Sequence, residues 1–403
     1  MAAEKFCSNA SMGLGKSQGV NGFILFCAGE DSGDSLGAVA VAAAMHLGFS
    51  TKGAGGILMQ KAGLFPLVNF EELPVSGFSD IVPHCFRLRK NLRILENALN
   101  DSKCKAFVAV DYPGFNMALS QKAKSLNIPV LYISPPQIWA WKKKRVKKLA
   151  DIELAVLFEF EKRIYAKCGL NAHCFSFPFS NAISVDLNKS RNVSAQSAAI
   201  SETRILLFPG SRLSQMRRNM KLYLPLAEEL RKRNFNPVFV ASRPNLLRKL
   251  RRLLTLRFPV LQAPESLDMR ARLFSKAAAA VAPPGTITLE LALVGTPFVA
   301  SARFEPFTYL IGRFFVRTKT FVLPNILLQK TWVPEKLFPL WKSIHEEIRI
   351  ILNEIRLLSK NNFICNSAML AAAMPQVTLD ELTLEFFVKL IQGESAQSRS
   401  PAR

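Results

Sequence analysis

The chain has 403 residues, of which 49% are hydrophobic and 21% charged, so it is too long for one ordinary core and too apolar for a disordered chain. Lysine and arginine number 53 against 30 acidic residues, and the formal net charge of +23 favours a phosphate-rich partner or an anionic membrane surface, although charge alone allows nucleic acid equally. Seven scattered cysteines without a CxxC pair fit a reducing compartment and neither a disulfide framework nor a zinc site.

The first 21 residues lack the apolar core of a secretory signal and the arginine content of a transit peptide, so we expect a flexible tail over 1–21. No uncharged apolar stretch reaches the roughly 18 residues that span a bilayer. The sequence therefore predicts that any membrane role is peripheral.

From residue 22, short apolar runs alternate with helical patterns, which predicts βαβ units and mostly parallel sheets. The first strand is "GFILFCAG" (22–29), followed by the small-residue helix "SLGAVAVAAAMHLG" (35–48). Further strands are predicted within 106–115, 127–141 and 152–161. Together they predict an N-terminal Rossmann-like domain over 22–188.

The loop after the first strand reads G-E-D-S-G-D, where a dinucleotide-binding fold would have G-x-G-x-x-G. Two carboxylates, Glu30 and Asp34, would repel a pyrophosphate, so NAD or FAD binding here is disfavoured. Asp34 is either functional or a partner of the helix terminus. Glu30, still in the loop, is expected to face a pocket.

Residues 78–99 have an amphipathic pattern that allows two interpretations, a helix buried on one face or a helix lying on a membrane surface. Leu95 and Arg93 continue the apolar and basic faces. The candidate membrane contacts are Phe86, Arg87, Leu88, Arg89, Lys90 and Leu92.

Asp111, in "AVDYPGF", ends a predicted buried strand, where open α/β sheets place their ligands. A carboxylate there is costly unless it is paired or functional, which makes Asp111 a candidate general base. The basic stretch with two tryptophans at 134–148 is either a solvated face or a lip that touches lipid or phosphate.

A polar, unperiodic stretch at 186–202 is the candidate domain boundary, and a second α/β series predicts a C-terminal Rossmann-like domain over 200–372. Its predicted elements are a strand and turn at 204–212, a helix at 221–233, a strand at 236–242, and a strand, helix and strand within 277–301.

Two turns in this half carry phosphate-binding chemistry. "LFPGSR" places Gly210, Ser211 and Arg212 after a strand, where backbone N–H groups, a hydroxyl and a guanidinium converge. "PPGTITLE" opens a helix at Gly285 and Thr286, one turn before a carboxylate, Glu290, that suits ribose hydroxyls. Together they predict a nucleotide-diphosphate site.

No metal site or cofactor is expected. The four histidines (His46, His84, His173 and His345) are dispersed, and neither H-E-x-x-H nor D-x-D occurs. The end of the chain predicts a helix over 376–392 that packs back on the N-terminal domain, with a capping box (Thr378, Glu381), a C-cap at Gly393 and a tail to residue 403.

Taken in chain order, these motifs resemble the lipid-A-disaccharide synthase family, glycosyltransferases of the GT-B type with two Rossmann-like domains facing a cleft. The matching stretches are "AGEDSGDSLGA", "VDYPGFNMAL", "YISPPQIWAWKKKRVKKL", "FPGSR", "PGTITLE", "PFTYLIGRFFVRTKTFVLPNIL" and "VPEKL". The resemblance covers roughly residues 22–392.

The resemblance implies an inverting transfer of 2,3-diacylglucosamine from UDP to 2,3-diacylglucosamine 1-phosphate, which yields the β-1,6-linked disaccharide phosphate and UDP. Asp111 matches the family's candidate base, and Asn325 its L-P-N asparagine. Glu30 and Ser32 would contact the acceptor beside Asp111, and Arg212 with the helix start at 285–290 would stabilise the departing UDP without metal.

The resemblance also implies a location on the cytoplasmic face of the inner membrane, with lipid-linked donor and acceptor as partners and no nucleic acid. It raises a homodimer with exchanged C-terminal segments, which nothing in the residues decides.

Four positions depart from the family pattern: Gln215, Pro284, Phe177 and Phe338 stand where a glutamate, part of an S-G-T turn, a histidine and a glutamine are usual. Several lie on the predicted UDP side, which predicts that binding of the nucleotide is altered or weakened. Two alternatives stay open, a diverged GT-B transferase with another nucleotide-sugar donor and a catalytically weakened membrane-surface binding protein.

Overall fold

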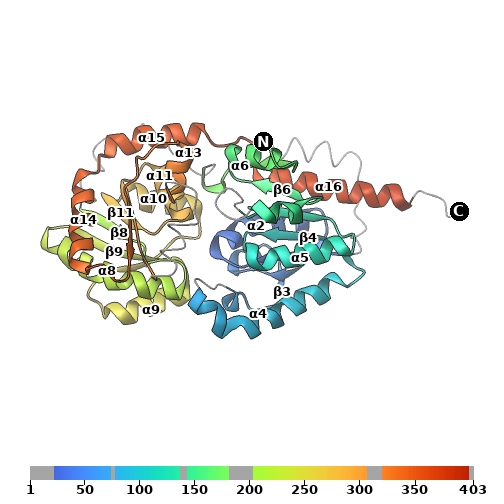
Figure 1. Cartoon of the computed structure of the whole chain (residues 1–403), viewed down its shortest axis with the longest axis horizontal. Helices are drawn as coiled ribbons and strands as arrows, with labels where there is room; N and C mark the ends of the chain where they lie inside the picture. Colours follow the sequence, from blue (N-terminus) through green and yellow to red (C-terminus); the bar gives the residue numbers. More distant parts are fainter. Residues whose placement is uncertain (1–21, 74–77, 137–142, 181–202, 306–319, 399–403) are drawn as a thin grey trace. The chain divides into compact units, whose positions relative to one another are not determined.

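The computed structural model describes residues 22–73, 78–136, 143–180, 203–305 and 320–398, which form two α/β units, each built around a parallel sheet (Figure 1). Unit 1 comprises the described parts of Met1–Pro74, Pro83–Phe177 and Pro375–Arg403. Unit 2 comprises those of Val75–Val82 and Pro178–Met374. The predicted fold class, α/β with mostly parallel sheets, is confirmed.

The sheet of unit 1 has seven strands in the order β3-β2-β1-β4-β5-β6-β7, and all recorded neighbours are parallel. They are β1 (Phe23–Ala28), β2 (Ser50–Ala54), β3 (Phe65–Pro66), β4 (Cys104–Val110), β5 (Val130–Ile133), β6 (Glu153–Val156) and β7 (Ala172–Cys174). Every residue of β1 is buried, because helices cover both faces of a central parallel strand. The chain reverses its direction of winding between β1 and β4.

Helices complete unit 1. They are α2 (Asp31–His46), α3 (Ile57–Lys61), α4 (Phe78–Leu99), α5 (Pro113–Ser125), α6 (Glu159–Ala166) and α16 (Leu379–Ser398), with 3₁₀ turns η1 (Phe70–Glu72) and η2 (Lys143–Leu149). The alternate residues Phe23, Leu25 and Cys27 of β1 share a core with Leu95 and Leu99 of α4, which is why that helix is amphipathic.

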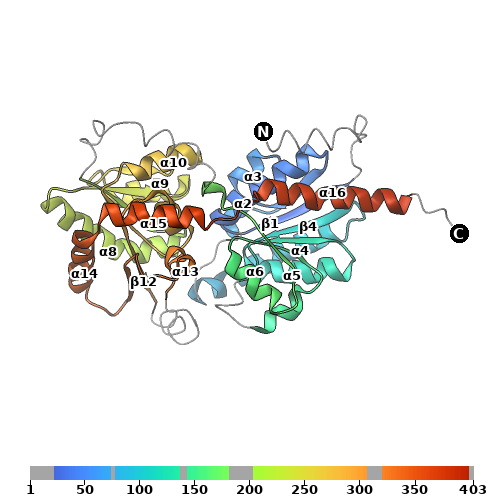
Figure 2. The same cartoon turned by 90° about the horizontal axis from the view of Figure 1, so that it is seen from above.

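The C-terminal helix α16 returns to unit 1 and packs on α2 (Figure 2). Phe387 is fully buried, and its ring centroid lies 6.0 Å from that of Phe49. The predicted capping box is confirmed: the Thr378 amide donates to Glu381 at 2.9 Å, and the Glu381 amide donates to Thr378 Oγ1 at 3.2 Å. The predicted C-cap at Gly393 is wrong, because α16 continues to Ser398; an interior glycine costs a helix only about 1 kcal/mol.

Unit 2 has a six-stranded parallel sheet in the order β10-β9-β8-β11-β12-β13. The strands are β8 (Arg204–Leu207), β9 (Asn236–Ala241), β10 (Val260–Gln262), β11 (Ala279–Ala282), β12 (Phe298–Phe304) and β13 (Glu335–Pro339). The helices are α8 (Leu213–Lys232), α9 (Pro244–Leu254), α10 (Leu267–Ser275), α11 (Thr286–Val294), α13 (Leu323–Leu327), α14 (Ile344–Leu357) and α15 (Lys360–Ala372).

Helix α8 begins at Leu213, eight residues before its predicted start at 221, and runs through Pro225. An interior proline costs about 3 kcal/mol. Met216, Met220 and Tyr223 lie at helical spacing and are buried in the core of unit 2, which offsets that cost.

Several predicted features lie outside the described residues. They are the tail at 1–21, the tryptophans Trp139 and Trp141, the boundary at 186–202 and most of the stretch that precedes "FVLPNIL". Within the described ranges, no helix is both long enough and apolar enough to cross a membrane.

Candidate functional site

In unit 1 the candidate residues lie where the sheet changes its direction of winding, at the carboxyl ends of β1 and β4. Asp111 follows β4 directly, and β1, which pairs with β4, is followed by Glu30 and by Ser32 in the first turn of α2. Open α/β sheets bind ligands at this switch point. The two sequence motifs therefore meet at the carboxyl ends of neighbouring strands, where a ligand is expected.

Asp111 and Tyr112 both have left-handed backbones, with φ of 47° and 51°. This conformation costs a residue other than glycine roughly 1–2 kcal/mol, and it persists where the surrounding structure enforces it, often at functional sites. The Asp111 amide donates to the carbonyl of Ile133 at 2.9 Å. Its carbonyl accepts from Tyr132 Oη at 3.1 Å and from Asn116 Nδ2 at 2.8 Å. The carboxylate therefore projects from a backbone held on three sides.

The Asp111 carboxylate meets the first turn of α2. Ser32 Oγ donates to Asp111 Oδ2 at 3.4 Å, and both residues are partly buried. Glu30 is the N-cap residue of the same helix, also partly buried, with an extended backbone. The structure thus brings Ser32 and Asp111 together and places Glu30 two residues before Ser32.

Gly29 has a packing role that differs from the glycines of a dinucleotide loop. A Cβ atom at position 29 would lie 2.4 Å from the ring of Tyr112, and Tyr112 Oη donates to the Leu73 carbonyl at 2.7 Å. The aromatic ring therefore occupies the space beside Gly29.

Asp34 stabilises a helix terminus, although not that of its own helix. Its carboxylate accepts from the amides of Leu58 and Met59, both at 3.0 Å, and so caps α3 across 24 residues of sequence. Burial raises the pKa of the Asp34 carboxyl, and the hydrogen bonds from Met59, Leu58 and Gly56 oppose this shift. The interpretation that Asp34 caps the start of its own helix is wrong, because its carboxylate caps α3 and not α2.

We expect Asp34→Ala to lower the free energy of unfolding by about 1–3 kcal/mol, because it leaves two amide groups without their acceptor. Chemical denaturation followed by circular dichroism measures the change. Asp151→Asn is the control: its carboxylate is 85% exposed and pairs with Lys124, asparagine tolerates the left-handed φ of 57°, and the change should alter stability by less than about 1 kcal/mol. Equal effects in the two variants would contradict the capping role.

In unit 2 the two predicted phosphate motifs follow neighbouring strands at a second switch point. Leu207, the last residue of β8, pairs in register with Val281 of β11, so the loops after both strands leave the sheet at the same level. Gly210 has φ of 126°, and a Cβ there would lie 2.5 Å from Gln215 Oε1. The Ser211 amide donates to that oxygen at 3.3 Å. Gln215 therefore lines the turn in which phosphate binding was predicted.

Two helices begin beside the carboxyl ends of β8 and β11, and the N-cap residue of neither helix makes a side-chain capping hydrogen bond. Arg212 is the N-cap residue of α8, and Gly285, with φ of 153°, is that of α11. Thr286 is the first residue of α11 and is partly buried. Backbone N–H groups at two adjacent helix starts favour a negative ligand, and a guanidinium at one of them adds to that preference.

Glu290 lies one turn into α11 and pairs with Arg270, with Arg270 Nη1 and Glu290 Oε1 2.9 Å apart. Burial raises the pKa of Glu290, and the nearby Arg270 guanidinium acts against this shift. Arg270 Nε also donates to the Pro264 carbonyl at 3.0 Å. The carboxylate proposed for ribose thus has a cationic partner that the sequence motif did not reveal.

Asn325 is 1% exposed, and its amide binds the chain itself. Its Nδ2 donates to the Val333 carbonyl and to Glu335 Oε1, both at 2.9 Å, and its Oδ1 accepts from the amides of Trp332 and Val333. Glu335 is in register with Ala300 of β12, which is in register with Ala282, the last residue of β11. Asn325 therefore fixes the loop before β13, and this loop lies at the same height along the sheet as the turn between β11 and α11.

The departures from the family pattern fall in different surroundings. Phe177 and Phe338 are 6% and 4% exposed, and Phe338 belongs to the core of unit 2. Gln215, in the first turn of α8, accepts from the Ser211 amide of the predicted phosphate-binding turn, and Pro284 precedes Gly285. Within unit 2, these last two adjoin the predicted nucleotide site.

The six candidate membrane contacts on α4 fall into two sets, one partly buried and one exposed. Leu88 and Leu92 are partly buried and pack against the core of unit 1. Phe86 is 81% exposed, and its neighbours with exposed side chains are Arg87, Arg89 and Lys90.

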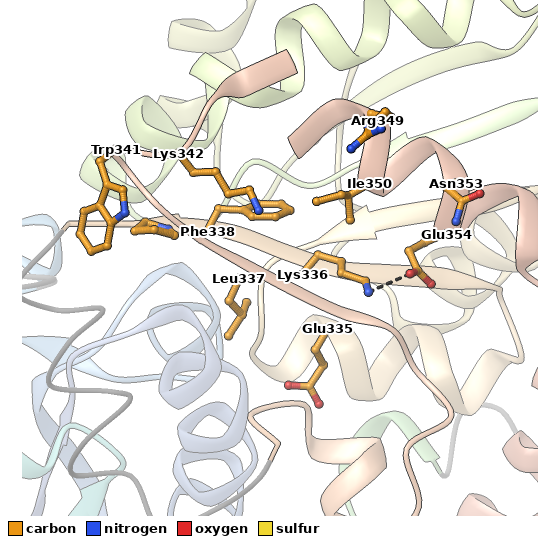
Figure 3. A pocket seen from close by; sticks show the side chains of 11 residues that line it. Glu335, Lys336, Leu337, Phe338, Trp341, Lys342, Arg349, Ile350, Asn353 and Glu354 are labelled. Atoms are coloured by element: carbon orange, nitrogen blue, oxygen red, sulfur yellow. Dashed lines mark ion pairs between the residues drawn. The ribbon is translucent and has the colours of Figure 1, made fainter. Parts of the chain in front are cut away.

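A hollow of about 850 Å³ lies along β13 and α14 in unit 2 (Figure 3). Trp341 lies at one end, and Lys336 Nζ pairs with Glu354 Oε1 at 2.8 Å within it. None of the predicted site residues lines this hollow. Among the described side chains, no group of three or more His, Cys, Asp or Glu is placed to hold a metal ion.

The structure adds residues that the motifs did not indicate: Asn116 and Tyr132 behind Asp111, Arg270 beside Glu290, and Glu335 beside Asn325. Asn116 is the fourth residue of α5 and is fully buried, and buried amides are normally hydrogen-bonded. The available sequence signal for it was a single amide side chain within the mostly apolar stretch "YPGFNMAL".

Comparison with known proteins gives one consistent result. The family model described as lipid-A-disaccharide synthetase matches residues 24–362. A lipid-A-disaccharide synthase of Geobacter metallireducens is 30% identical over 316 residues, which cover 77% of this chain and 82% of that protein. The enzyme of the same name from Anaeromyxobacter dehalogenans is 32% identical over 325 residues, covering 78% and 83%.

Solved structures agree on the fold. Arabidopsis thaliana UGT89C1 superposes with a TM-score of 0.56 at 12% identity, covering 91% of this chain and 99% of that one. The UDP-GlcNAc 2-epimerase of Neisseria meningitidis, solved with UDP-GlcNAc bound, gives 0.51 at 13% identity, covering 92% and 99%.

Proposed function

Because the chain belongs to the lipid-A-disaccharide synthetase family, we propose that it transfers 2,3-diacylglucosamine from UDP to the 6-hydroxyl of 2,3-diacylglucosamine 1-phosphate. It is a glycosyltransferase of lipid A biosynthesis with the two-unit α/β architecture of GT-B enzymes. The acceptor would bind unit 1 and the UDP-sugar unit 2. The observation that carries the assignment is Asp111, which extends from a strained backbone at the switch point and contacts Ser32.

We assign Asp111 as the general base. The acceptor 6-oxygen attacks the anomeric carbon while the Asp111 carboxylate takes its proton, and the bond from that carbon to the UDP oxygen breaks with inversion. Ser32 would orient the carboxylate or the acceptor, and Glu30 would receive a hydroxyl or amide of the sugar. Tyr132 and Asn116, which hold the Asp111 carbonyl, support a fixed position for the base.

Stabilisation of the leaving UDP is assigned to unit 2. Arg212, the Gly210–Ser211 turn and the α11 start at Gly285 and Thr286 would surround the diphosphate, where negative charge increases as the bond breaks. Glu290, beside Arg270, would lie toward the ribose, and Asn325 would fix the adjoining loop. Because these groups are cationic or donate backbone N–H groups, we expect transfer to continue in EDTA.

The assay that tests this function mixes purified protein with UDP-2,3-diacylglucosamine and 2,3-diacylglucosamine 1-phosphate in detergent, and measures disaccharide and UDP together. Equal amounts of both products support the transfer. UDP release with no disaccharide, or turnover only with a different UDP-sugar such as UDP-GlcNAc, would favour the diverged-transferase alternative. Absence of both products would favour the binding-protein alternative.

We further propose that the enzyme works at the cytoplasmic surface of the inner membrane, because both substrates are acylated and anionic. The exposed Phe86 with Arg87, Arg89 and Lys90 supports a contact at α4. The homodimer also stays a prediction, and light scattering of the purified protein measures its oligomeric state. In the single chain, α16 packs on α2.

We expect Arg87→Glu/Lys90→Glu to reduce sedimentation with phosphatidylglycerol vesicles by about tenfold, because each basic residue near an anionic surface contributes about 1 kcal/mol and reversal adds repulsion. Lys162→Glu/Lys167→Glu is the control, with the same charge change on exposed side chains of α6 and the turn after it. If both variants lose binding equally, net charge and not α4 is responsible.

A further inference from the structure

Unit 2 has a second basic surface, which the proposed reaction does not use. Residues 230–264 contain nine lysines and arginines and no aspartate or glutamate. This segment runs through β9, α9 and β10, and β10 with β9 forms one edge of the sheet. This segment of the sequence therefore contributes positive charge without acidic residues of its own.

Some of these cations have partners within the protein. Lys232 and Arg233 pair with Glu229 at 2.7 and 2.6 Å, Arg257 pairs with Glu228, and Arg231 lies over the Phe258 ring. Their charge is therefore partly compensated.

Four cations of α9 differ from these. Their side chains are exposed, and among the described residues none of them makes an ion pair: Arg248, Lys249, Arg251 and Arg252. On the opposite face of the helix, Leu246, Leu250 and Leu254 are buried in the core of unit 2. Helix α9 is thus anchored by one face and presents uncompensated positive charge on the other.

Two leucines accompany this charge on the surface. Leu253 is 50% exposed and Leu256 is 98% exposed. Thr255 and Leu256 both have left-handed backbones, with φ of 43° and 64°, a conformation that favours glycine or asparagine. Leu256 is therefore both exposed and in a strained turn, a combination that points to contact with a binding partner.

We propose that α9 and the turn after it, residues 248–256, dock on an anionic lipid bilayer, with Leu253 and Leu256 inserted at the level of the headgroups. Basic side chains next to exposed apolar ones suit an interface of lipid phosphates and acyl chains. A nucleic acid would satisfy the cations but has no use for exposed leucines. Docking here is independent of the α4 residues Phe86–Lys90, which belong to unit 1; that it would hold the donor-binding unit near its lipid substrate rests on the proposed function.

The first test measures partition of the full chain onto sucrose-loaded vesicles of phosphatidylglycerol and phosphatidylcholine, with pure phosphatidylcholine as the neutral reference. Arg248→Glu/Arg252→Glu should lower the partition coefficient for the anionic vesicles at least about tenfold. Lys162→Glu/Lys167→Glu, with the same change of net charge, should stay within about twofold. Equal partition of the α9 variant and wild type would overturn the proposal.

The second test separates lipid insertion from a general affinity for polyanions. Leu253→Asn/Leu256→Asn should reduce vesicle partition about tenfold while heparin binding and the melting temperature are retained, since asparagine tolerates the left-handed turn at 256. If this variant partitions like wild type while the arginine variant loses vesicles and heparin alike, the surface is a polyanion site and lipid docking is wrong. Neither readout involves glycosyl transfer, so its failure leaves the proposed reaction untouched.

Discussion

Asp111→Asn is expected to lower kcat for disaccharide formation by about 10²–10⁴-fold with little change in the affinity for UDP-sugar, because an amide cannot accept the proton of the acceptor hydroxyl. Asparagine is the informative replacement, since it has nearly the shape of aspartate and tolerates the left-handed φ of 47°. Product formation in detergent measures kcat, and calorimetry with UDP measures binding.

The control for this substitution is Asp101→Asn, whose carboxylate accepts from the Lys103 amide at an exposed turn. It should retain wild-type kcat. A pH–rate profile adds a readout that a structural role would not move: the wild-type rate should fall at acidic pH as the base becomes protonated, and the residual rate of Asp111→Asn should lose that limb. Full activity of Asp111→Asn would remove Asp111 as the base.

Arg212→Ala is expected to lower kcat by about 10²–10³-fold and to weaken UDP binding, because it removes a positive group from the start of α8, where diphosphate charge would develop. Loss of kcat beyond the loss of binding would indicate that Arg212 acts mainly on the transition state. Initial rates over a range of UDP-sugar concentrations separate kcat from KM.

Arg217→Ala provides the matched control, because Arg217 lies on the exposed side of the same helix about one turn further on. It should change kcat less than twofold while removing the same charge. If both arginine variants lose activity equally, the field of the whole basic surface, and not a contact at the phosphate turn, is responsible.

The candidate site was predictable from the sequence to the extent that its chemistry lies in short motifs. Asp111 at the end of a strand and Gly210–Arg212 after β8 were identified from local patterns, and Ser32, in the first turn of α2, from the family resemblance. Their partners were not, because Tyr132, Arg270 and Glu335 come from segments 10 or more residues away along the chain, and no local pattern specifies such contacts.

The sequence by itself determined the elements and the family: short apolar runs and helical patterns predicted β1, β4, β8 and α11 closely, and the motifs between them identified a lipid-A-disaccharide synthase relative. These features are local, since propensity and hydrophobic spacing act within a few residues.

Only the tertiary structure decided the strand orders that put β1 beside β4 and β8 beside β11, and so brought Ser32 to Asp111. It also assigned Asp34 to the distant α3 and buried Phe338 in the core of unit 2. The physical reason is that strand order and burial minimise the free energy of the whole packed unit, in which each contact depends on residues far apart in the sequence.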